Sequence, residues 1–151
     1  MNAFLQMCKT PKYKDTLNAY YASIRALKPG SPAPDFTLKD EQGKEVSLSS
    51  FKGNVVFIDF WGVGCSPCIS DIKNYVPKLH QRYYGKDVVF VNICVDVDEK
   101  SWKKAISKYK LDGVNLLAEG WLENEACKSY NINAVPHYIL INKEGKMAEP
   151  N

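Results

Sequence analysis

Residues 55–68 have the sequence VVFIDFWGVGCSPC, and the rest of the chain can be placed around this stretch. Its first part, residues 55–60, is a continuous apolar run with β-branched and aromatic residues, which predicts a buried β-strand. Gly62 and Gly64 then predict a turn into a helix. The two cysteines that follow, Cys65 and Cys68, therefore lie at a strand-to-helix junction.

The spacing of Cys65 and Cys68 brings them within reach of a disulfide. Residues three apart on a helix share a face, with Cβ atoms about 5–6 Å apart, which is near the separation that a disulfide requires. The alternative is half of a zinc site, which needs two more ligands at a workable spacing. Cys94 and Cys127 are solitary, and the two histidines stand on different predicted elements. The pattern therefore favours a redox-active dithiol that needs no metal and no other cofactor.

The bulk properties of the chain exclude several other functions. It has 151 residues, a net charge of +3 and no block of five or more like charges, which fits one ordinary domain and indicates no nucleic-acid or membrane-surface partner. No stretch approaches the roughly 18 apolar residues of a membrane span. Residues 1–8 lack the features of a signal peptide, and those before Cys8 do not fit a lipidation signal. Cys8, Cys94 and Cys127 are expected to be bystanders, because five cysteines with one close pair do not make a disulfide framework.

Ahead of the buried strand, the sequence predicts a helix and then a β-hairpin. Thr10 and Pro11 fit the N-cap and the first helical position, and Pro29-Gly30 ends the helical pattern. Apolar and aromatic residues recur between them at helical spacing: Tyr13, Leu17, Tyr20, Tyr21, Ile24 and Leu27. We expect this amphipathic helix to dock against an apolar surface. Alternating residues on both sides of a turn at 41–44 predict the hairpin.

Beyond the dithiol, helical patterns alternate with apolar runs. The expected elements are a helix at 65–84, a strand at 88–95, a helix at 98–109, a weaker strand at 114–118, a short helix at 122–130 and a strand at 135–142. Pro77 lies inside the first of these helices and predicts a kink there. Buried strands that alternate with helices are typical of a parallel sheet in an α/β protein.

The position of Cys65 at a helix N-terminus makes it the expected attacking thiol. The first-turn N–H groups and the helix dipole stabilise a thiolate there, and a pKa lowered from about 8.5 to about 7 makes about half of the thiol reactive at neutral pH. Cys68, one turn deeper, is the expected resolving thiol, which closes the disulfide and releases the reduced product. Between them lie Ser66 and Pro67, and Pro67 keeps the first turn rigid without losing a needed donor.

Asp59 interrupts the buried strand where burial should be deepest, between Ile58 and Phe60. Burial raises the pKa of a carboxyl group, so that it can hold or accept a proton near neutrality. We therefore expect Asp59 to relay the proton of Cys68. The alternative is that the strand ends there and Asp59 caps the turn in water.

Three motifs together resemble the thioredoxin superfamily in order and spacing: FIDFW at 57–61, CSPC at 65–68, and VP at 135–136 ahead of a strand. Two further segments, GSPAPDFTL at 30–38 and FKG at 51–53, resemble the TlpA-type, peroxiredoxin-like branch. The resemblance implies a thioredoxin-like α/β fold, in which helices flank a central mixed sheet that carries an added N-terminal hairpin. We expect a helical extension over residues 1–29 and this domain over residues 30–151.

The resemblance also implies roles for individual residues. Pro136 would be a cis-proline that faces the dithiol, and the backbone of Val135 would pair with an extended substrate peptide as an added strand. Trp61 would pack beside the active-site loop and, with Ser66 and Pro67, complete the substrate-binding surface, while Asp59 would be the buried acid. Members of this branch usually reduce disulfides of other proteins outside the cytoplasm, which implies protein thiol or disulfide substrates, an upstream electron donor and a periplasmic or other extracytoplasmic location.

Three departures from the family pattern matter. Gly64 stands where members commonly have tryptophan, so that Cys65 is expected to be less shielded and its loop more flexible. Pro77 lies farther along the helix than the usual kink, which predicts a shifted or longer helix. The family pattern continues after Gly145 with a strand and a helix, whereas this sequence stops at Asn151. We therefore expect either a truncated chain or another domain or protomer that covers that face of the sheet.

The function that these features predict is a thiol-disulfide oxidoreductase acting on proteins through a mixed disulfide. One alternative is a peroxidase, because the lead-in resembles peroxiredoxins; such enzymes place threonine three residues before the reactive cysteine, where this chain has Gly62. The other alternative is a binding module that presents the edge at Val135 and Pro136 without catalysing a reaction.

Overall fold

The computed structural model describes residues 10–148, so Cys8 and the last three residues lie outside the described part of the chain. Its elements in order are α2 (Pro11–Ala26), β1 (Thr37–Asp40), β2 (Glu45–Ser47), the 3-10 helix η1 (Leu48–Phe51), β3 (Val55–Trp61), α3 (Ser66–Asn74), α4 (Val76–Tyr83), β4 (Val88–Cys94), α5 (Glu99–Tyr109), β5 (Val114–Leu117), the 3-10 helix η2 (Trp121–Glu123), α6 (Glu125–Ser129) and β6 (His137–Ile141). Each element that the sequence predicted is present, with the long central helix divided in two.

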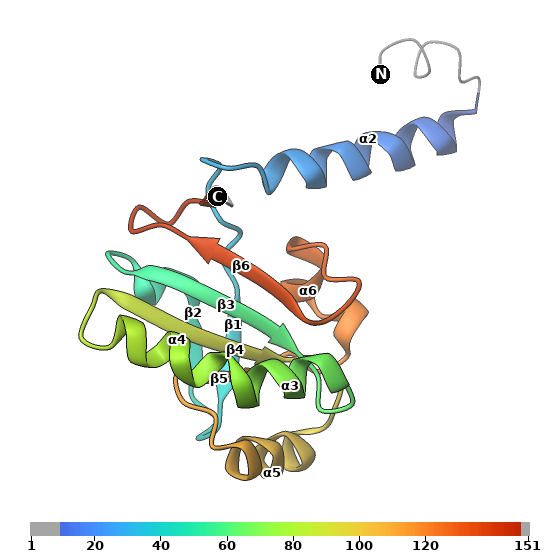
Figure 1. Ribbon diagram of the computed structural model, residues 1–151. Coiled ribbons are helices and arrows are strands. Elements are labelled where there is room, and N and C mark those ends of the chain that lie inside the picture. The colour runs from blue at the N-terminus through green and yellow to red at the C-terminus, as the bar shows by residue number, and fades with distance from the viewer. Residues whose placement is uncertain (1–9, 149–151) are drawn as a thin grey trace.

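The strands form a single mixed sheet in the order β2-β1-β5-β4-β3-β6. The three central strands β3, β4 and β5 run parallel, while β6 lies antiparallel to β3 and the β1-β2 hairpin joins through an antiparallel contact between β1 and β5. Figure 1 shows β3 between β6 and β4 in this sheet. The expected thioredoxin-like α/β architecture with an added hairpin is confirmed.

Strand β3 shows why the sheet holds the site where it does. Its side chains alternate between the two faces, as the pleat requires. Val56, Ile58 and Phe60 pack into the larger of two apolar clusters. Trp61 belongs to the other cluster, together with residues from α3 and α5. Because Asp59 is two residues from Trp61, it faces the side that carries α3 and α4.

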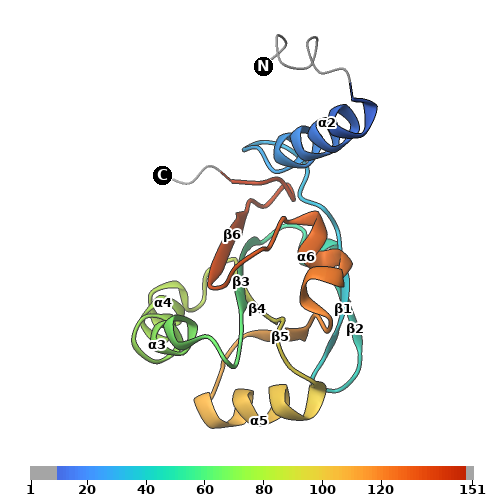
Figure 2. The ribbon, with the colours of Figure 1, turned by 90° about the vertical axis from the view of Figure 1, so that its right-hand side faces the viewer.

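The helices cover the two faces of the sheet unequally. Figure 2 shows α3 and α4 on one side of the sheet and α6 on the other. The predicted kink is confirmed as a break: α3 ends at Asn74, Tyr75 intervenes, and α4 begins at Val76 with Pro77 in its first turn. A proline is tolerated at that position because its missing N–H would have no partner in a new helix. α5 begins at Glu99, and Asp98 caps it as predicted, because its side chain accepts the N–H of Ser101.

Helix α2 extends away from the sheet (Figure 1), and the segment after it runs beside the segment that follows β6. Gly30 donates to the carbonyl of Met147, and Met147 donates to that of Ser31. The expected docking of the tyrosine-rich stripe is not met within the described residues, because Tyr13 and Tyr20 are 62% and 60% exposed. Across residues 10–148, no helix combines the length and the apolar character needed to cross a membrane.

Candidate functional site

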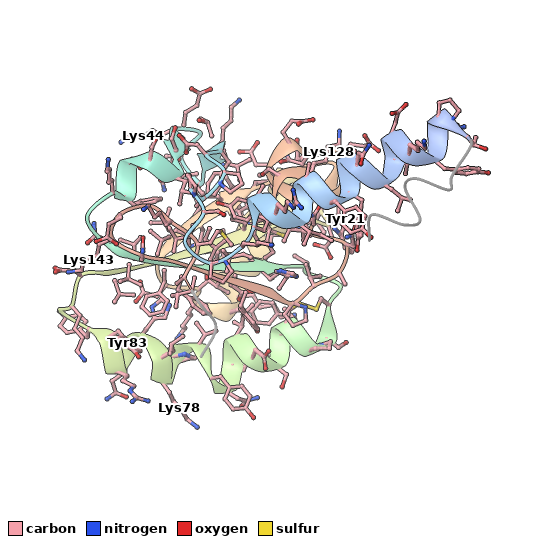
Figure 3. The ribbon with its side chains drawn as sticks, turned by 90° about the horizontal axis from the view of Figure 1, so that it is seen from above. Tyr21, Lys44, Lys78, Tyr83, Lys128 and Lys143 are labelled. Atoms are coloured by element: carbon pink, nitrogen blue, oxygen red, sulfur yellow. A yellow bond between two sulfur atoms is a disulfide. The ribbon has the colours of Figure 1, made fainter. Side chains whose placement is uncertain are left out.

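The two cysteines lie where β3 passes into α3, as the sequence predicted. Cys65 and Cys68 are joined by a disulfide, with their Cα atoms 5.3 Å apart. The bond is visible beside the beginning of α3 in Figure 3. Cys65 is the N-cap of α3, and its sulfur accepts the backbone N–H of Cys68 at 3.2 Å. The helix therefore directs a first-turn donor at Cys65, which favours a thiolate there.

Cys65 and Cys68 differ in how deeply they are buried. Cys65 is half-buried, whereas Cys68 is 1% exposed and packs with Trp61, Ile72 and Cys94 in the apolar cluster beneath α3. Ser66 and Pro67, between the two cysteines, are exposed. A substrate can therefore approach Cys65 from outside, and Cys68 is accessible only from within the site.

Asp59 is buried within β3 at 3% exposure, so the alternative of an aspartate that caps a turn in water is wrong. Burial, and then the negative charge of Asp71, raise its pKa from 3.8 to about 7. Its Oδ1 has no hydrogen-bond partner among the described residues. An unsatisfied buried carboxyl that titrates near neutrality can exchange a proton during catalysis.

Two residues beside Asp59 were not identified from the sequence. Asp71 lies on α3, and its Oδ2 accepts the hydroxyl of Tyr138 at 2.7 Å. Tyr138 is also the partner of Asp59 in the register between β3 and β6. Burial, and then the hydrogen bond to Asp71, raise the pKa of this tyrosine. The spacing of Asp71, three residues after Cys68 and so on the same helix face, is the one sequence signal that could have suggested it.

The segment before β6 reaches the dithiol from the other side. The Val135–Pro136 peptide bond is cis, as the family resemblance implied. The carbonyl oxygen of Val135 lies 3.5 Å from the sulfur of Cys65. Tertiary structure thus brings together residues 70 positions apart, and a main-chain acceptor stands directly beside the expected attacking sulfur.

Trp61 does not lie where a substrate-binding residue should. Its side chain is fully buried at 0% exposure, in the cluster with Cys68 and Trp102. Because β3 turns its last side chain toward α3 and α5, Trp61 supports the site from beneath and offers no surface to a substrate. The substrate-binding role expected for it is therefore corrected to one of packing.

The loop before Cys65 is tethered, which corrects the expectation that Gly64 makes it flexible. The carboxylate of Asp96 accepts the N–H of Val63 through Oδ1 and that of Gly64 through Oδ2, each at 2.8 Å. Asp96 follows β4, which lies parallel to β3, so the ends of both strands meet at this edge of the sheet. Asp96 was not predicted from the sequence as a residue of this site.

The other described cysteines are buried. Burial raises the pKa of Cys94 to about 12 and that of Cys127 to about 11, so both remain thiols at neutral pH. Within residues 10–148, no group of three or more histidine, cysteine, aspartate or glutamate side chains is arranged to hold a metal ion. Among the described cysteines, only Cys65 and Cys68 form a disulfide.

Comparison with known proteins agrees with this geometry. The Redoxin family model matches residues 28–150. The thiol-disulfide oxidoreductase ResA of Bacillus cereus (strain ATCC 10987 / NRS 248) is 30% identical over 130 residues, which cover 86% of this chain and 73% of that protein. ResA of Bacillus subtilis (strain 168) is 30% identical over 132 residues, covering 87% of this chain and 72% of that protein.

Solved structures give the same result. The thioredoxin domain of a thiol-disulfide oxidoreductase from Bacteroides vulgatus superposes with a TM-score of 0.73 at 36% identity, covering 81% of this chain and 86% of that one. A thiol:disulfide interchange protein from Bacteroides sp. gives 0.73 and 36%, covering 81% and 80%. With its thioredoxin-like sheet and its disulfide at the start of α3, this chain belongs to the Redoxin family and is a thiol-disulfide oxidoreductase.

Proposed function

We propose that the protein reduces disulfides of other proteins, with Cys65 as the attacking thiol and Cys68 as the resolving thiol. The observation that carries this assignment is the asymmetry of the pair: Cys65 is half-buried and caps α3, while Cys68 is 1% exposed. A protein substrate can reach the first sulfur and is too large to reach the second.

The proposed reaction starts from the reduced pair. The Cys65 thiolate attacks one sulfur of the substrate disulfide and expels the other as a thiolate, which takes up a proton. Cys68 then loses its proton and attacks the sulfur of Cys65, which breaks the mixed disulfide and expels the second substrate thiolate. Two electrons pass to the substrate, and the Cys65–Cys68 disulfide remains. An upstream dithiol donor must reduce it again before the next turnover.

Asp59 is the proposed acceptor of the Cys68 proton. Its pKa of about 7 lets it take up a proton at neutral pH and release it again within the catalytic cycle. Its position supports this role, because Asp59 and Cys68 both belong to the side of the sheet that α3 covers. Asp59 can then pass this proton to the departing substrate thiolate.

The main chain at Val135 is the proposed docking edge for the substrate. Its carbonyl lies 3.5 Å from the sulfur of Cys65, so an extended peptide that bonds to this edge places its own sulfur next to Cys65. The cis-proline Pro136 directly follows this carbonyl and is part of the proposed docking edge. Ser66 and Pro67 are exposed beside the disulfide and complete the contact surface.

The proposed location is an oxidising, extracytoplasmic compartment such as the periplasm. Protein disulfides that serve as substrates persist in such compartments, whereas the cytosol keeps thiols reduced. Fractionation of the source cells, followed by trapping of free thiols with a maleimide, tests this. Recovery of the protein only in the cytosolic fraction would refute the proposed location.

A covering partner is proposed for the face of the sheet that carries α3 and α4. There, an apolar groove is lined by side chains of β3, α3, α4 and β6, including Phe57, Leu79 and Tyr138. Leu140 on β6 is 42% exposed, and α2 also presents an exposed stripe. We propose that the thioredoxin-like domain spans residues 30–151. A further domain or protomer covers these surfaces. Light scattering of the purified chain tests self-association, and a monomer at all concentrations would exclude a second copy as the cover.

The experiment that tests the reaction compares two single variants. Cys65→Ser is expected to abolish the reduction of insulin by dithiothreitol-recycled protein. Cys68→Ser should instead accumulate a mixed disulfide, visible on a non-reducing gel. Full turnover by both variants would refute the dithiol mechanism.

Two other functions predict different experimental outcomes. If the parent chain has no reductase activity, and a Cys65→Ser/Cys68→Ser variant still binds its partner, the protein is a binding module. The peroxidase alternative requires threonine at position 62, but a Cβ atom on Gly62 would lie 2.7 Å from Oδ2 of Asp96. Peroxide consumption at rates comparable to insulin reduction would contradict our assignment.

A further inference from the structure

Asp96 binds the loop that leads into Cys65 through both of its carboxylate oxygens. Oδ1 accepts the N–H of Val63 and Oδ2 that of Gly64, each at 2.8 Å. The loop closes on itself as well, because Cys65 donates its N–H to the carbonyl of Gly62 at 3.2 Å. The residue directly before the attacking cysteine is thus held by a side chain 32 positions away in sequence.

The two glycines of the loop are explained by this contact. A Cβ atom on Gly62 would lie 2.7 Å from Oδ2 of Asp96, and one on Gly64 would lie 3.3 Å from the same oxygen. Neither glycine has a positive φ, so backbone conformation does not require glycine at these positions. The close approach of Asp96 is what requires glycine there. The sequence WGVGC at 61–65 is therefore built to receive a carboxylate.

The charge of Asp96 also bears on the chemistry of Cys65. A carboxylate that binds the N–H of the preceding residue lies within about one Debye length of the Cys65 sulfur, so solvent ions screen it only in part. Its effect on a neighbouring thiol is visible at Cys94, whose sulfur lies 3.6 Å from Oδ1. There, burial raises the pKa most, a hydrogen bond from the backbone of Asp96 lowers it, and the charge of the Asp96 carboxylate raises it. Negative charge near Cys65 opposes its thiolate in the same way.

We propose that Asp96 is the positioning residue of the dithiol site: it holds the 62–64 loop in place for attack by Cys65, and its charge biases the Cys65–Cys68 pair toward donating electrons. The bias follows because a thiolate exists only in the reduced form. A charge that destabilises this thiolate makes the reduced pair a better electron donor. Conversely, a dithiol whose thiolate is stabilised acts as an oxidant when it is in the disulfide form. This inference rests on the proposed function and names the residue whose charge favours its direction of electron flow.

The charge component is tested with Asp96→Asn, which keeps the shape of the side chain. The equilibrium of the Cys65–Cys68 pair with reduced and oxidised glutathione is measured by alkylation and mass spectrometry. The variant is expected to shift about tenfold toward the dithiol, which corresponds to a reduction potential about 30 mV higher. A shift of less than twofold would overturn this part of the proposal.

Asp98→Asn is the matched control. Asp98 lies two residues from Asp96, and Asp98→Asn changes the net charge by the same amount. The variant can still cap α5, because asparagine is an equally good N-cap. Its equilibrium with glutathione should stay within twofold of the parent. An equal shift in both variants would show a general charge effect and refute a specific role of Asp96.

The positioning component is tested with Gly64→Ala, which keeps the charge and crowds the carboxylate. The rate at which the reduced protein attacks a small aromatic disulfide is expected to fall about tenfold, while the glutathione equilibrium stays within twofold of the parent. An unchanged rate would refute the positioning role. This variant also keeps the proposal testable if Asp96→Asn does not fold.

These measurements can be separated from a failure of the proposed function. The glutathione equilibrium requires only that the disulfide forms, and it does not depend on any protein substrate. If the parent chain does not reduce insulin but Asp96→Asn shifts the equilibrium as expected, the proposed substrate class is wrong and the role of Asp96 stands. If insulin is reduced and the equilibrium does not shift, only the inference about Asp96 fails.

Discussion

The hydroxyl of Tyr138 donates a hydrogen bond of 2.7 Å to Asp71, and both residues stand beside the buried carboxyl of Asp59. Asp71 belongs to the helix that carries the dithiol, while Tyr138 belongs to the edge strand β6. Tyr138 is 43% exposed, so this hydrogen bond lies at the surface of the protein. The titration of Asp59 is set by its burial in β3 and by the charge of Asp71 on α3.

Replacing Asp71 should lower the pKa of Asp59. Burial is the largest cause of the raised pKa, and the charge of Asp71 is the second, so Asp71→Asn removes only the second. The pKa should fall from about 7 but remain above its ordinary value of 3.8. Carbon NMR of the Asp59 carboxyl group as a function of pH measures this directly.

Tyr138→Phe is the control for that measurement. It removes the hydroxyl but keeps the ring, which is stacked on Phe57 at a centroid distance of 5.6 Å. The charge of Asp71 remains, so the pKa of Asp59 should stay raised. An identical titration curve for Asp59 in Asp71→Asn and the parent protein would contradict the electrostatic coupling.

The raised pKa of Asp59 predicts that the protein loses stability as the pH rises. Since the folded pKa of about 7 lies above the unfolded value of 3.8, the native state holds the extra proton between these values. The free energy of unfolding should therefore fall from about pH 4 to about pH 7 through this group. Asp59→Asn should remove this loss, so that at pH 9 the variant is more stable than the parent protein. The upper limit of this difference in the free energy of unfolding is about 4 kcal/mol, at about 1.4 kcal/mol per pKa unit.

Urea unfolding of the disulfide form at pH 4, 6 and 9 checks this prediction. Asp87→Asn serves as a comparison of opposite sign, because a hydrogen bond from Lys143 at 2.7 Å lowers the pKa of Asp87. Stability from that exposed pair is present above the unfolded pKa and is lost as the pH falls. Equal effects of Asp59→Asn at pH 4 and pH 9 would show that its carboxyl does not titrate as described.

Gly113 should be far less tolerant of substitution than Gly85. Both have a positive φ, of +99° and +71°, which costs an alanine about 1 kcal/mol. A Cβ atom on Gly113 would also lie 2.7 Å from the carbonyl oxygen of Phe90 in β4, whereas nothing lies within 4 Å of one on Gly85. Gly113→Ala should therefore cost about 2–4 kcal/mol in the free energy of unfolding. Thermal unfolding of both alanine variants tests the difference, and similar melting temperatures would disprove it.

Local pattern was sufficient for most of the fold. The apolar run at 55–60, the glycines after it and the alternation around 41–44 predicted β3, the start of α3 and the hairpin, because these signals act between near neighbours. Pro77 predicted the break between α3 and α4 for the same reason. The attachment of the hairpin to β5 could not be predicted, since a hairpin carries no local mark of which edge it joins.

The sequence by itself determined the chemistry of this protein: a dithiol at 65–68 on a strand-to-helix junction, with Asp59 in the strand that leads to it. Tertiary structure alone decided the surroundings of that dithiol. Asp96 reaches the 62–64 loop, and Tyr138 reaches Asp71, only because parallel β4 and antiparallel β6 flank β3 in a particular register. Contacts between residues 32 and 67 positions apart depend on how strands pair, and no local spacing encodes that pairing.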